Sequence, residues 1–123
     1  MYLPKTDIYN CLKTLNYYVS QTQPIEFTDL PAITFRVGNN SIDTDLDNNI
    51  ISQDIEIIVD IWAEDSVTAS TVLSQVENVL RLNNYNMSYS SDVPNTGNLY
   101  HINCRFTTIA VSYTHLRAHE TGR

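Results

Sequence analysis

Residues 50–82 constrain the fold more than any other stretch, because a strand pattern there runs directly into a helix pattern. Over residues 54–61, isoleucine and valine alternate with acidic residues, so one face of the predicted strand is aliphatic and the other is charged. From Ala69 to Leu80, apolar residues recur at steps of three and four, which predicts a helix with one apolar stripe. Each large aliphatic side chain removed from water contributes roughly 1.5–3 kcal/mol. We therefore expect this helix to lie on the aliphatic face of the strand.

The remaining periodicity predicts one further helix and three further strands. The helix is expected over residues 5–20, and the strands over 32–37, 85–91 and 99–109. The element order is α-β-β-α-β-β. It predicts an α+β domain in which a four-stranded, mainly antiparallel sheet carries both helices on one face. Asp65 or Ser66 is the expected N-cap of the second helix.

Two polar stretches are expected to interrupt this pattern. Gly38, Asn39 and Asn40 are predicted to end the first strand. The following residues, 41–49, have no apolar period, so we expect an exposed and mobile loop.

The C-terminal residues 111–123, VSYTHLRAHETGR, resemble the translation of a transposon-end adapter used in sequencing libraries. We therefore interpret residues 1–110 as a single domain and residues 111–123 as a non-native tail, so that the true C-terminus is expected to be missing. A chain of this length can bury about 65% of its unfolded surface, which is enough for one core.

The charge balance disfavours nucleic-acid binding. Residues 1–110 contain five lysines and arginines against thirteen acidic residues, a formal charge of −8. No basic stripe is present to neutralise phosphates, so no specific nucleic-acid binding is expected. Cys11 and Cys104 predict no disulfide framework, and no stretch is apolar enough to indicate membrane insertion or secretion.

Few residues indicate chemistry. One stretch has the spacing of a calcium-binding loop, with aspartates at the first, third, fifth and twelfth positions: Asp43, Asp45, Asp47 and Asp54. However, Asn48 stands at the sixth position, where that loop needs glycine. A solvated hairpin loop is therefore the preferred interpretation. His101 lies on a polar strand face with no nucleophile placed beside it by the sequence. No nucleotide-binding or zinc motif occurs, so we predict no enzyme activity, no cofactor and no metal.

Aromatic residues on a charged sheet face indicate assembly. Trp62 is in phase with the acidic face of the long strand, so we expect it either to be covered by residues 41–49 or a helix end, or to be available to another chain.

Several segments together resemble the tail-terminator or tail-completion proteins of long-tailed (siphovirus-type) bacteriophages. They are PAITFRV, IEIIVDIWAED before a helix ending in VENVL, and GNLYHINCRFTTI. The resemblance covers residues 5–109. It implies a structural protein of the virion tail or neck, assembled in the host cytoplasm. It also implies a hexameric ring that caps the tail tube and meets the tube protein and a head-completion or connector protein.

On this interpretation we place two groups of residues as hypotheses. Asp43, Asp45 and Asp47 would face the channel or the tube, and Trp62, Tyr100 and Arg105 would lie near contacts with other subunits. The alternative is a small acidic inhibitor, or an immunity-like protein, that binds a basic partner. Carboxylates concentrated in one loop and one strand face favour the ring, since mimics of nucleic acid usually spread their charge over an entire surface.

Overall fold

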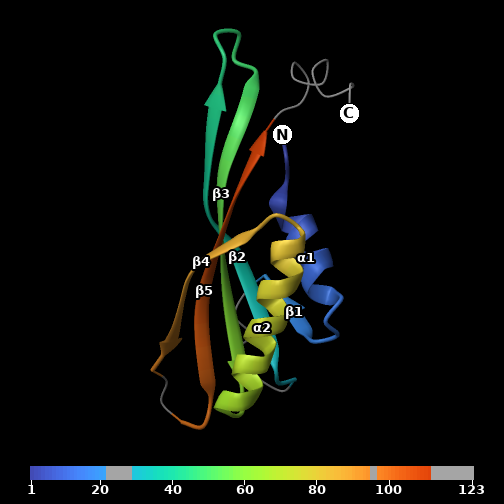
Figure 1. Ribbon diagram of the computed structural model, residues 1–123, viewed down its shortest axis with the longest axis vertical. Coiled ribbons are helices and arrows are strands. Elements are labelled where there is room, and N and C mark those ends of the chain that lie inside the picture. The colour runs from blue at the N-terminus through green and yellow to red at the C-terminus, as the bar shows by residue number, and fades with distance from the viewer. Residues whose placement is uncertain (22–28, 95–96, 112–123) are drawn as a thin grey trace.

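The computed structural model describes residues 1–21, 29–94 and 97–111. Seven elements follow one another along the chain (Figure 1). They are α1 (Pro4–Lys13), β1 (Tyr18–Ser20), β2 (Ala32–Thr44), β3 (Ile50–Ala63), α2 (Ser66–Leu82), β4 (Asn86–Val93) and β5 (Tyr100–Val111). The α+β class is confirmed.

The sheet has five strands in the order β1-β2-β3-β5-β4, so the prediction of four strands was wrong. The four strands β2 to β5 form the predicted antiparallel arrangement. The additional strand, β1, pairs in parallel with the first three residues of β2, from Ala32 to Thr34. The sheet is therefore mixed.

The first helix is shorter than predicted, and this change makes room for β1. The helix ends at Lys13, and Asn16 adopts a left-handed conformation with φ of 63°. Asparagine tolerates this conformation better than most residues, so it can turn the chain out of the helix. Tyr18 and Val19, which continue the helical spacing in the sequence, lie instead on β1.

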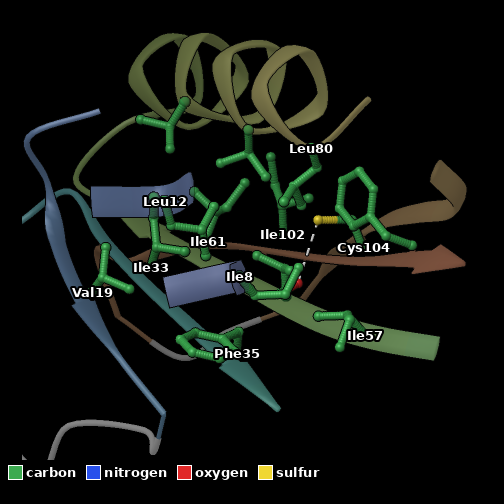
Figure 2. Packing of buried hydrophobic residues seen from close by; sticks show 14 of the residues in the cluster. Ile8, Leu12, Val19, Ile33, Phe35, Ile57, Ile61, Leu80, Ile102 and Cys104 are labelled. Atoms are coloured by element: carbon green, nitrogen blue, oxygen red, sulfur yellow. Dashed lines mark hydrogen bonds between the residues drawn. The ribbon is translucent and has the colours of Figure 1, made fainter. Parts of the chain in front are cut away.

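Both helices pack on one face of the sheet, as predicted (Figure 1). The odd-numbered residues of β3 from Ile55 to Ala63 are buried on this face. Figure 2 shows how side chains from the helices and strands meet in one core. Its largest fully buried members include Ile8, Leu12, Ile33, Phe35, Ile57, Ile61, Val72, Val76, Leu80 and Phe106.

The strand-to-helix junction forms as the sequence predicts. Asp65 is the N-cap of α2, and its side chain accepts a hydrogen bond of 2.7 Å from the Thr68 amide. This hydrogen bond lowers the pKa of the Asp65 carboxyl. At the other end the helix stops at Leu82, and Asn84 follows with φ of 68°.

Gly38 does not end β2, which contradicts the prediction. The register between β2 and β3 shifts between Val37 and Asn39, and pairing then continues to Thr44. A Cβ at Gly38 would lie 2.7 Å from the Glu56 carboxylate and 2.8 Å from Ile58 Cδ1, so glycine lets the neighbouring side chains approach at this β-bulge. Residues 41–44 are consequently strand rather than loop.

Leu80 and Leu82 provide a direct test of the packing. Leu80 is 0% exposed, and Leu82, two residues on in the same helix, is 69% exposed. We expect Leu80→Ala to lower the free energy of unfolding by about 2–5 kcal/mol, because it leaves a cavity beneath α2. The control Leu82→Ala should change it by less than about 0.5 kcal/mol. Urea denaturation measures both, and equal effects would contradict the placement of α2.

Candidate functional site

The sheet face opposite the helices carries a polar cluster around Asp60. His101 Nε2 lies 2.6 Å from Asp60 Oδ1, and Asn103 Nδ2 donates to the same oxygen over 3.0 Å. Arg36 approaches the other carboxylate oxygen at 3.7 Å. Three strands, β2, β3 and β5, supply these groups. The polar strand face predicted around His101 therefore forms, and the Asp60 carboxylate organises it.

Trp62 lies on this same face, as its phase predicts, but it is only 5% exposed. Its ring stacks on His101 with 3.7 Å between ring centroids, and its Nε1 donates to Thr34 Oγ1 over 3.3 Å. Residues 41–49 do not cover it, since Trp62 pairs with Ala32 at the opposite end of the β2–β3 hairpin from the turn. That alternative was wrong. Within one copy, Trp62 is a buried residue rather than an accessible contact surface.

The other two residues placed near subunit contacts are accessible but lie on different faces. Arg105 is on the face opposite the helices, where it pairs with Glu56 at 3.8 Å and lies 5.7 Å from the centroid of the Tyr89 ring. Tyr100 is in phase with the buried residues Ile102 and Cys104 but is half exposed at the end of the sheet. Trp62, Tyr100 and Arg105 therefore do not form one patch.

The predicted acidic loop is the end of a long hairpin, which we call the arm (residues 39–55 of β2, β3 and the turn between them). In Figure 1 the arm extends beyond both helices. Asp45 organises its turn, since one of its carboxylate oxygens accepts hydrogen bonds of 2.9 Å from the amides of Asp47 and Asn49. Asp43 and Asp47 are exposed beside it. The loop is exposed, as expected, and its turn is closed by backbone hydrogen bonds as well.

Sequence reasoning missed the residue at the apex of this turn. Leu46 is the most exposed of the large apolar residues described, with a relative exposure of 102%. A single leucine between two aspartates gives no periodic signal. Only the hairpin geometry reveals that it stands at the end of the molecule.

The base of the arm is fastened to the N-terminus by Gln53. The amide of this 2%-exposed side chain accepts from the Tyr2 N–H over 2.8 Å and donates to the Tyr2 carbonyl over 3.1 Å. It also donates to Asn40 Oδ1 over 3.1 Å. The Tyr2 and Tyr85 hydroxyls lie 2.8 Å apart, and burial raises the pKa of each. The N-terminal segment thus braces the arm against the body.

The described residues contain no group of three or more side chains suited to hold a metal ion, and none of the described helices is long and apolar enough to span a membrane. Both cysteines are free thiols. Burial raises the pKa of Cys104 to about 12, and its sulfur donates to the Val59 carbonyl on the helix side of the sheet. This thiol therefore lies on the other face from His101.

Two strand edges are open along the described part of the chain. β4 forms one border of the sheet, and its outer side has no strand beside it. At the other border, β1 pairs only with Ala32–Thr34, so β2 is unpaired on that side from Phe35 to Thr44. Unpaired edges are templates for pairing with another chain.

Comparison with known proteins gives a fold. Neither a protein-family model nor a curated protein matches the chain. Among solved structures, a chain from the virion of a native gene transfer agent particle matches with a TM-score of 0.63. The two have the same fold. Sequence identity is 8%, and the match covers 85% of this chain and 92% of the other.

Gln53→Glu tests the brace at the base of the arm. A carboxylate can still accept from the Tyr2 amide, but it cannot donate to the Tyr2 carbonyl or to Asn40. We expect a loss of about 1–3 kcal/mol in the free energy of unfolding at neutral pH. Burial should raise the pKa of the new carboxyl in the folded state. The variant should therefore be most stable, relative to wild type, below the unfolded pKa of about 4.3, and lose that stability as pH rises through the folded pKa.

Urea denaturation between pH 4 and pH 8 measures this difference. The exposed substitution Gln75→Glu on α2 is the control for the added charge. A Gln53→Glu difference that does not vary with pH would contradict the buried, donating role of the Gln53 amide.

Proposed function

We propose that this chain is a structural protein of a phage-like virion, in which a ring of identical copies caps the tail tube and joins it to the head-completion complex. The fold shared with a gene transfer agent virion chain supports a virion component. The resemblance of PAITFRV, IEIIVDIWAED and GNLYHINCRFTTI to tail terminators supports the position at the tail end. On this proposal the protein acts by assembly, and no catalytic step is required.

The observation that carries the ring is the pair of open edges on opposite borders of the sheet. A contact between two different edges is heterologous, so repeating it generates a closed ring or a filament. Strand direction alternates from β2 through β3 and β5 to β4. In a ring whose copies all point the same way, β4 of one copy would therefore meet β2 of the next in antiparallel orientation, the commoner pairing.

The lengths and side chains of the two edges are compatible with this contact. β4 has eight residues, and the open part of β2, Phe35–Thr44, is of similar length. β4 contains no lysine, arginine or proline, the residues that commonly protect an edge strand. β4 thus lacks these protecting side chains, while each edge has a β-bulge, between Met87 and Tyr89 on β4 and between Val37 and Asn39 on β2.

Placing the middles of the two edges opposite each other implies a stagger between neighbours. Tyr89 is level with Arg36 across the sheet, through Arg105 and Ile58. The middle of the open edge of β2 lies near Asn40, about four residues further along β2. An offset of four residues over the four strands β2 to β4 equals one residue per strand. In an eight-stranded barrel with this ratio, the strands tilt by about 36° from the barrel axis. A ring with this stagger would have the strand tilt of ordinary closed sheets.

A charged residue on either edge should prevent the ring. We expect Ser90→Lys on β4 and Asn39→Lys on β2 each to leave a folded monomer, because a lysine in the edge blocks strand addition. Ser70→Lys on the exposed face of α2 is the matched control. Native mass spectrometry, with and without tail tube, measures the stoichiometry, for which the family resemblance implies six copies.

A wild-type chain that remains monomeric both alone and on tail tubes would overturn the proposal. A tight one-to-one complex with a cationic protein would instead support the acidic-inhibitor alternative.

A further inference from the structure

We infer that the tip of the arm is a plug that binds a recessed apolar socket with a cationic rim, on a protein other than this chain. This inference rests on the proposed function for the choice of partner. The proposed ring uses β4 and the open edge of β2 up to Thr44, whereas the plug centres on Leu46 in the turn between β2 and β3. The two contacts can therefore be tested separately.

Leu46 is displayed by an ordered turn. Its side chain is fully exposed, so the fold does not use it for packing. The turn beneath it is fixed by the Asp45 side chain and by the backbone pairs Asp45 N to Asn49 O and Asn48 N to Asp45 O, of 2.9 Å and 3.1 Å. An apolar side chain on a preorganised turn loses little conformational entropy when it is bound. Leu46 therefore has the properties of an anchor residue.

Carboxylates surround this apolar apex. Asp43 and Asp47 are exposed on either side of it, and Ile42 on the adjoining strand is also exposed. An apolar pocket would bury the leucine, and lysine or arginine around its mouth would pair with the two carboxylates. Such a pocket is the complementary surface in both shape and charge.

A second copy of this chain is a poor source of that rim. In residues 1–110 there are five basic residues, and three of them, Arg36, Arg81 and Arg105, already pair with acids within the chain. Lys5 and Lys13 are spaced over the length of α1. The charge balance thus favours a different, more basic partner.

The position of the tip indicates where that partner lies. The arm extends along the strands, beyond both helices, at the end of the molecule away from the α2 N-terminus (Figure 1). In a ring whose copies point the same way, every tip would project from one rim, along the axis. The socket would then belong to the next component stacked on the ring, which is the tube protein because the proposed ring caps the tail tube.

Leu46→Asp tests the plug directly. The probe is the tail-tube protein encoded by the same genome, immobilised at low density, with binding measured by surface plasmon resonance. We expect Leu46→Asp to weaken binding by at least about tenfold per copy, because one leucine loses its burial. Val67→Asp, at a residue 75% exposed on α2, is the matched control and should bind as wild type does. The double variant Asp43→Asn and Asp47→Asn should flatten the salt dependence of binding.

Ring formation is measured on the same samples by native mass spectrometry, which separates the two hypotheses. If Leu46→Asp rings bind the tube protein as well as wild-type rings do, the plug is overturned while the ring stands. The same holds if wild-type rings do not bind the tube protein. A Leu46→Asp chain that no longer forms rings makes the tip a contact between copies, which also overturns the plug. A monomer that binds the tube protein through Leu46 upholds the plug while the proposed ring fails.

Discussion

The fold depends on the face of β3 that is wholly apolar from Ile55 to Ala63. Its odd-numbered residues from Ile55 to Ala63 are buried beneath the helices, and Asp54, Glu56 and Asp60 project from the other side. A slip of one residue against β2 or β5 would exchange these faces, bringing carboxylates into the core. Burial therefore fixes the register on both sides of β3. The open edges, the Asp60 cluster and the direction of the arm all follow from that register.

Local periodicity was enough to predict most of the elements but not their extent. The long strand and α2 were predicted, and Asp65 was one of the two predicted caps, because each has its signal within a few neighbouring residues. β1 was not predicted, because three residues carry no period and because the apolar helical spacing continues in the sequence past Asn16, where the folded helix has ended. Gly38 was predicted to end the strand, but in the folded chain it lies in a β-bulge. Glycine fits there because the side chains of Glu56 and Ile58 on the partner strand approach its Cα closely.

The candidate site shows the same division between local and distant information. The face of Trp62 follows from alternation, but its burial depends on His101, which lies about forty residues later in the chain. The acidic residues of the turn were identified from their type. What the sequence could not reveal was that Asp45 holds the turn together and that Leu46 stands at its apex. The described surface thus has three distinct parts: two open strand edges, a polar face ordered by Asp60, and a turn with one exposed leucine among aspartates.

The stacked indole of Trp62 has a practical consequence, because it is the chain's one tryptophan. Contacts with Thr34 on β2 and His101 on β5 hold the ring, so its intrinsic fluorescence would report on the joining of these strands to β3. The arm tip lies at the far end of the same hairpin, well away from the chromophore. Trp62 emission should therefore follow unfolding of the sheet and should not change when the tip binds another molecule. It thus reports on folding independently of binding at the tip.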